Sequence, residues 1–151
     1  MTPILTYLLT LAALLGTGYA SPVIRDEYPE VVPGPGMPSL AELGLTSWDL
    51  FEMTPIPADS GLNKRYICTT RNQPCTIAAA QTCVNYLKNL GTTNCAVGRS
   101  DTLMVSSGGC KINGISTSGG STSSYCRDVG NGAQTIVDRC SGNGKTAGML
   151  P

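Results

Sequence analysis

All seven cysteines of this 151-residue chain lie after residue 65, at Cys68, Cys75, Cys83, Cys95, Cys110, Cys126 and Cys140. Such a density of cysteine in a small domain indicates either a metal site or disulfides, and the cellular compartment decides between them. The intervals between successive cysteines hold 6 to 15 residues, whereas paired zinc ligands are usually two to four residues apart. An oxidising compartment would therefore give disulfides. Three bridges leave one thiol unpaired, and spacing does not determine the connectivity.

The N-terminus predicts secretion. Residues Ile4 to Leu15 form an apolar run of twelve, and the first twenty residues carry no charged side chain. The small residues Gly18 and Ala20 suit signal peptidase, which predicts cleavage after Ala20. The alternative is an uncleaved membrane anchor, but the run is shorter than the ~20 residues that span a bilayer. We expect residues 1–20 to be a signal peptide, and the processed protein to be extracellular with no stable membrane span.

A reversal of charge predicts a second cut. Residues 21–65 carry seven acidic and three basic side chains, a net charge of −4, whereas residues 66–151 carry three acidic and seven basic side chains, a net charge of +4. The dibasic pair Lys64-Arg65 lies at this reversal. Such pairs are substrates of kexin-type proteases of the secretory pathway, which would cleave after Arg65. The chain is thus predicted to be an acidic pro-segment (21–65) followed by a mature cysteine-rich domain (66–151).

The pro-segment is rich in proline, with five of the residues from Pro22 to Pro38 being Pro. Such a stretch is expected to be extended or disordered. One short helix is predicted from Ser39, as its cap, to about Phe51. We consider two roles for the pro-segment. It either covers an apolar, basic surface of the mature domain until cleavage, or it is a disposable spacer.

The mature domain shows two helical patterns with β-prone runs around them. The first helix is predicted from the cap Thr76 to Gly91, and the second from Ser123 or Ser124 to Cys140. Gly130 and Gly132 weaken the second helix. Strands are predicted at 66–70, 102–106, 110–117 and 145–150, while 116–124 is expected to be a flexible loop. The order β-α-β-β-α-β predicts an α+β two-layer sandwich, with a four-stranded antiparallel sheet and both helices on one face. AQTCVN (80–85) and AQTIVD (133–138) form a faint internal echo.

The composition disfavours catalysis. The chain has no His and the mature part has no Glu, so a Ser or Cys nucleophile lacks its usual base. Acid–base work would depend on Asp101, Asp128 and Asp138 alone. We therefore predict no catalytic, metal or cofactor-binding residues. The seven basic residues of the mature part form no cluster and have no aromatic platform beside them, so nucleic acid is not expected as a partner. A binding or toxin-like protein remains.

These features together resemble those of fungal small secreted cysteine-rich proteins of the effector or killer-toxin-like class. The resemblance rests on the signal peptide, on Lys64-Arg65, on the pattern C-x6-C-x7-C, and on the segments GCKINGIST, SSYCRDVGNGAQTIVDRC and NGKTAGM. The virally encoded smut killer-toxin-like group is similar in its kexin processing and α/β sandwich. The necrosis-inducing effector family is similar over residues 110–149, where a Cys-bearing strand precedes a DV-containing helix ending in Cys.

The resemblance implies a virulence factor that is secreted into the plant apoplast and acts without catalysis on host immunity or host cell death. One competing function is an antimicrobial killer toxin directed at rival microbes. Another is a structural protein of the cell surface. The expected partners are a kexin-type protease during maturation and an unidentified target on a host or microbial surface.

Overall fold

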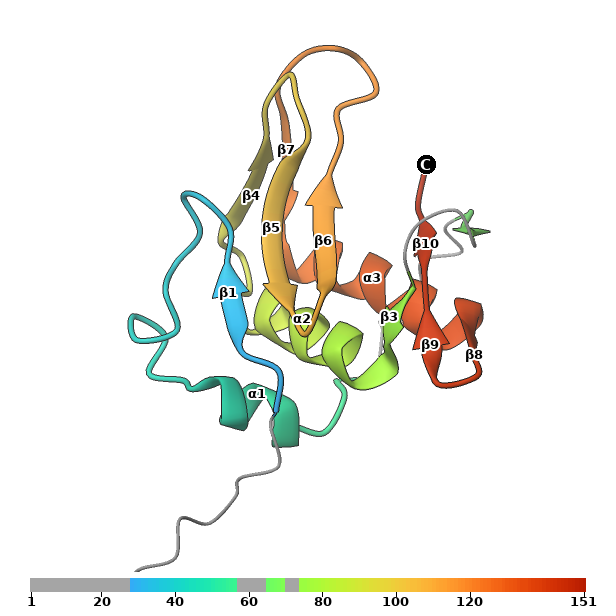
Figure 1. Ribbon diagram of the computed structural model, residues 1–151. Coiled ribbons are helices and arrows are strands. Elements are labelled where there is room, and N and C mark those ends of the chain that lie inside the picture. The colour runs from blue at the N-terminus through green and yellow to red at the C-terminus, as the bar shows by residue number, and fades with distance from the viewer. Residues whose placement is uncertain (1–27, 57–64, 70–73) are drawn as a thin grey trace, which may run out of the picture.

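The computed structural model describes residues 28–56, 65–69 and 74–151 (Figure 1). The predicted signal peptide and the predicted cleavage residues Ala20 and Lys64 lie outside the described residues. The elements of the described part are, in chain order, β1 (Val31–Pro33), α1 (Ser47–Glu52), β2 (Ile67–Cys68), β3 (Cys75–Thr76), α2 (Ile77–Asn89), β4 (Asn94–Val97), β5 (Thr102–Ser107), β6 (Cys110–Gly114), β7 (Thr122–Tyr125), α3 (Cys126–Cys140), β8 (Ser141–Gly142), β9 (Lys145–Thr146) and β10 (Gly148–Met149). The predicted α+β class is confirmed.

Helix α2 confirms the first helical prediction. Its N-cap is Thr76, whose side chain accepts a hydrogen bond from the backbone N–H of Ala79. Gly91, just past its end, adopts a left-handed conformation with φ 57°, as glycine commonly does after a helix. The helix is buried around most of its circumference, and Cys83, Val84 and Leu87 have no exposed surface. It is therefore the central element of the core.

Helix α3 begins later than predicted. Ser123 and Ser124 belong to strand β7, and the N-cap is Tyr125, which makes no side-chain capping hydrogen bond. The predicted serine cap is wrong because Thr122–Tyr125 pair as strand β7, and the helix begins at the next residue, Cys126. A Cβ on Gly130 would lie 2.9 Å from Cγ of Lys88 on α2. The glycine that weakens α3 locally therefore lets the two helices approach closely.

The β5–β6 hairpin is also confirmed. Gly108 and Gly109 join the strands with φ values of 50° and 80°, a conformation that favours glycine and suits a tight hairpin turn. Strand β1 pairs with the other edge of β5 and completes a three-stranded sheet. In Figure 1, α2 crosses the ends of β5 and β6 nearest their turn, and α3 lies beside it.

The remaining strands do not extend this sheet in the described part of the chain. Strands β2 and β10 pair with each other, with Ile67 opposite Met149. Strand β4 pairs with β7, and β3, β9 and β8 form a small sheet of their own. Residues 122–124, predicted as part of a loop, thus belong to strand β7. The single four-stranded sheet of the predicted sandwich is not confirmed, because β2 and β10 pair with each other but with neither strand of the β5–β6 hairpin.

Three disulfides join six of the seven cysteines, consistent with the expected cysteine-rich, disulfide-bonded domain. They are Cys68–Cys140, Cys75–Cys110 and Cys95–Cys126. The seventh cysteine, Cys83, is a buried free thiol on α2. Burial raises the pKa of this thiol to about 12. Because the thiolate is the reactive form of cysteine, Cys83 acts in the fold as a small apolar side chain.

The helices of the described residues are too short or too polar to cross a lipid bilayer.

Candidate interaction surface

Residues 28–56 lie against the cysteine-rich domain, and we call them the covering segment. Its first contact is strand β1, which pairs antiparallel with β5 so that Val31 lies opposite Ser107 and Pro33 opposite Val105. The backbone N–H of Gly34 continues this pairing by donating to the carbonyl of Met104 at 2.8 Å. The expectation of an extended chain here is confirmed, and the strand is placed at an edge of the domain's hairpin (Figure 1).

The helix predicted from Ser39 is divided into two pieces. Ser39 and Glu42 form a single turn, in which the backbone N–H and hydroxyl of Ser39 donate to the Glu42 carboxylate. These hydrogen bonds lower the pKa of Glu42. The turn ends at Gly44, whose φ is 64°. Helix α1 then starts from a capping box formed by Thr46 and Asp49. The predicted helix was too long because the glycine interrupts it.

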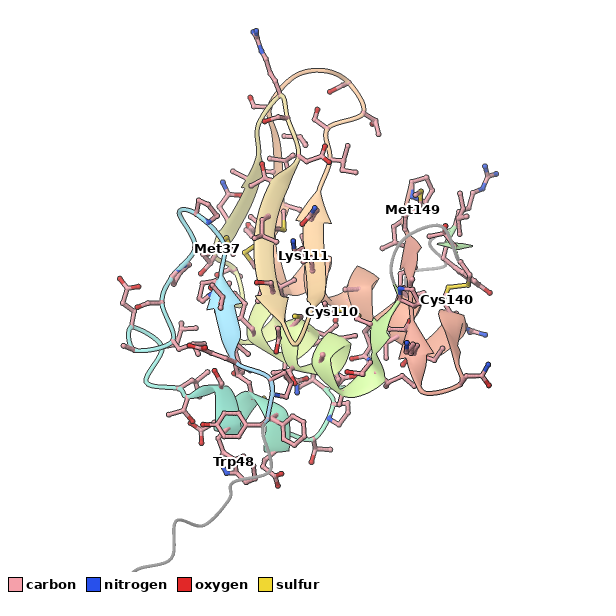
Figure 2. The ribbon with its side chains drawn as sticks, viewed as in Figure 1. Met37, Trp48, Cys110, Lys111, Cys140 and Met149 are labelled. Atoms are coloured by element: carbon pink, nitrogen blue, oxygen red, sulfur yellow. A yellow bond between two sulfur atoms is a disulfide. The ribbon has the colours of Figure 1, made fainter. Side chains whose placement is uncertain are left out.

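The apolar side chains of the covering segment belong to the same core as those of the domain. Leu50 of α1 has no exposed surface and Val31 of β1 is 4% exposed. Five more side chains of the segment are partly buried against this core: Met37, Leu40, Leu43, Leu45 and Met53. Trp48 is on the outer side of α1, 45% exposed (Figure 2), where it contacts Tyr28 and Phe51. One face of α1 is therefore embedded and the other is open.

Side chains of α2 donate hydrogen bonds to backbone carbonyls of the covering segment. The Asn85 amide donates to Leu50 at 2.9 Å and to Met53 at 3.2 Å. The Tyr86 hydroxyl donates to Pro38 at 2.6 Å, and the Lys88 ammonium donates to Ile56. Asn85 and Tyr86 have no exposed surface and Lys88 is 8% exposed. Since buried polar groups need partners, the segment supplies the acceptors for donors that are buried beneath it.

These donors continue into a polar network between α2 and α3. The amides of Gln81 and Gln134 donate to each other at 2.9 Å in both directions. Gln81 also donates to Asn85 at 3.0 Å, and Gln134 donates to Asp138 at 3.0 Å. Gln81 and Gln134 occupy matching positions in the internal echo AQTCVN and AQTIVD. The echo thus corresponds to one symmetric contact between the two long helices.

The sequence left open whether the pro-segment covers an apolar, basic surface of the domain or is a disposable spacer. The hypothesis of a covered apolar, basic surface is supported for its apolar part. Among the described contacts of the segment with the domain, the basic side chain is Lys88, and its acceptor is a carbonyl of the segment. The ion pair found between described residues joins Arg127 to Asp128 at 3.8 Å, within the domain. The described contacts of this surface are thus apolar packing and hydrogen bonds to the main chain.

Of the predicted processing residues, Arg65 lies within the described part of the chain. Arg65 is exposed, and it follows the last described residue of the segment, Ile56, by nine positions. In the described residues no cluster of three or more His, Cys, Asp or Glu side chains could hold a metal. An open depression of about 390 Å³ lies over β7 and the start of α3, lined by Asn94, Ser123, Ser124, Tyr125 and Asp128.

A family model described as a domain of unknown function (DUF8794) matches residues 63–150, more than half of the chain. The chain belongs to this family. The matched range begins at Asn63, two residues before the predicted cut after Arg65, and it excludes the covering segment. No curated protein and no solved structure matches the chain. The DUF8794 unit therefore corresponds to the cysteine-rich domain, with the covering segment as an additional layer before it.

Proposed function

We propose that this member of the DUF8794 family is a secreted fungal effector that acts in the host apoplast by binding a surface target, without catalysis. The observation that carries the proposal is the disulfide framework. Three bridges close chain separations of 72, 35 and 31 residues in a small domain. Such bridges persist in oxidising compartments outside the cell. They stabilise a domain whose core is too small to be very stable by packing alone.

Two sequence features support binding as the mode of action. The chain has no His, and the domain after residue 65 has no Glu, so the usual general bases of hydrolytic enzymes are missing. The carboxylate of Asp138 accepts a hydrogen bond from Gln134, and Asp128 pairs with Arg127. Both groups have structural contacts that account for their positions. A surface that recognises a partner by shape needs none of these reactive groups.

The maturation pathway is part of the proposal. A signal peptide (1–20) would direct secretion, and a kexin-type protease would cut after Arg65, which is exposed and therefore accessible. The start of the family match at Asn63 supports a boundary at this point.

The test is to purify the protein from a secreting culture and apply it separately to plant leaves and to cultures of rival fungi. A host response without growth inhibition supports the effector function. Growth inhibition without a host response would instead support a killer toxin. Retention in the wall fraction with neither activity would support a structural protein. A sample whose disulfides have been reduced and alkylated is the control, and it is expected to be inactive because the framework is lost.

A further inference from the structure

The covering segment is joined to the domain by the chain alone and by non-covalent contacts, because all seven cysteines follow residue 65. The described contacts of the segment end at Ile56, nine residues before Arg65. A cut after Arg65 would therefore break the covalent link without touching any of these contacts. We propose that the covering segment stays bound to the domain after this cut, as a non-covalent second chain.

The first argument is the sheet. Strand β1 is an edge strand of the order β1-β5-β6. If it left, β5 would become the edge and would expose the backbone groups that now pair with Val31, Val32 and Pro33. An uncovered edge strand is a site of aggregation and non-native pairing. Retention of β1 keeps this edge paired in the processed protein.

The second argument is the buried donors of α2. Asn85, Tyr86 and Lys88 all donate to carbonyls of the segment. Without the segment these hydrogen bonds would be lost together, and the donors of α2 would lose the backbone carbonyls that they contact. Because the acceptors lie at Pro38, Leu50, Met53 and Ile56, the segment is held at several points and not at a single one.

The third argument is apolar burial. The segment contributes two buried and five partly buried apolar side chains to the core of the domain. Leu50 is as completely buried as Leu87 in the centre of α2. Release would bring these side chains and their partners into water, which is unfavourable in proportion to the apolar area exposed. The segment thus behaves as a layer of the fold.

The consequence for function is a separation of two steps. Cleavage at Arg65 would give a two-chain protein in which α2 and the edge of β5 remain covered. Access to that surface would require displacement of the segment in addition to the cut. This inference depends on the predicted cut and is independent of whether the target belongs to a host or to a rival microbe.

The test uses the full secreted chain with the cut made in vitro. Uncut protein, purified away from any cut fraction, is treated with a kexin-type protease and examined by native and denaturing mass spectrometry at micromolar concentration. We expect one native species containing both chains and two separate chains under denaturing conditions. A native species consisting of the domain alone, or of two copies of the domain, would overturn the proposal. Failure of natural processing is recognised separately, as uncut chain in the culture medium.

A matched pair of glycine variants tests the geometry. A Cβ on Gly34 would lie 1.9 Å from the backbone oxygen of Leu103, so Gly34→Ala forces β1 away from β5. Gly98 has no neighbour within 4 Å of such a Cβ, so Gly98→Ala is the control. We expect Gly34→Ala to weaken retention of the segment by about tenfold or more and Gly98→Ala to leave it unchanged. Equal retention in both variants would contradict the close approach of Gly34, next to β1, to strand β5.

Discussion

Replacement of Leu50 by alanine tests whether the covering segment is part of the cooperative fold. Leu50 has no exposed surface, and removal of a buried leucine side chain typically costs about 2–5 kcal/mol. Helix α1 has six residues and lies at the edge of the core, so partial collapse around the cavity favours the lower half of that range, about 2–3 kcal/mol. We expect Leu50→Ala to lower the free energy of unfolding of the uncut chain by this amount.

The assay is urea denaturation of the uncut chain, followed by circular dichroism and by the fluorescence of Trp48, the only tryptophan. For a slope of about 1–3 kcal/mol per M, the expected loss moves the midpoint down by about 0.7–3 M. Ile56→Ala is the control. Its side chain is 43% exposed, and its backbone carbonyl, which accepts from Lys88, is kept. A shift below about 0.5 M is expected for it.

After the cut, the same free energy becomes a change in affinity between the two chains. A loss of about 2–3 kcal/mol corresponds to a dissociation constant raised by about 30- to 150-fold. Midpoints that shift equally little for Leu50→Ala and Ile56→Ala would refute the reasoning. So would a Trp48 transition that precedes the circular dichroism transition in the unaltered chain, because the segment would then detach independently of the domain.

Further predictions concern Tyr86 and the cysteines. Burial, and secondarily the Glu42 carboxylate, raise the pKa of Tyr86 to about 12. The stabilising contribution of Tyr86 is therefore complete below its ordinary pKa of about 10 and is lost as pH rises towards 12. Tyr86→Phe should lower the free energy of unfolding at pH 8 by about 1 kcal/mol and reduce the loss of stability at alkaline pH, both measured by urea titration. Cys83 should resist iodoacetamide in the native protein and react in urea, as read by mass; reaction of the native protein would contradict its burial. Disulfide mapping should find Cys68 joined to Cys140. Replacement of both by serine should lower the free energy of unfolding by about 4 kcal/mol, because the bridge closes a loop of 72 residues. Urea unfolding of the uncut chain measures this loss.

Local signals made the central helix and the hairpin predictable. Thr76 and Gly91 mark the ends of α2, and Gly108 and Gly109 mark the turn between β5 and β6. Each of these signals acts over a few residues, so it can be read without knowing the rest of the fold. The disulfide pairing could not be read in this way. It joins residues that only the tertiary structure brings together, and Cys83, in the middle of α2, is buried without a bridge.

The missed elements depend on distant partners. Strand β7 consists of Thr122, Ser123, Ser124 and Tyr125, all exposed, and lacks the apolar alternation by which a strand is usually recognised. It forms because it pairs with β4, next to the bridge from Cys95 to Cys126. The covered surface was one of two roles that the sequence left open for the pro-segment, and the residues that form it could not be predicted. The proline-rich composition of the covering segment indicated an extended chain, but the side chains against which Val31 and Leu50 pack are brought together only in the folded domain.

The absence of cysteine before residue 65 affects how this protein has to be prepared. Once the chain is cut, no covalent bond would join the covering segment to the domain. Electrophoresis in detergent and reversed-phase chromatography would each separate the two chains. A recombinant fragment that starts at Tyr66 would expose the faces of α2 and β5 that the covering segment contacts, and its binding behaviour would differ from that of the two-chain protein proposed above.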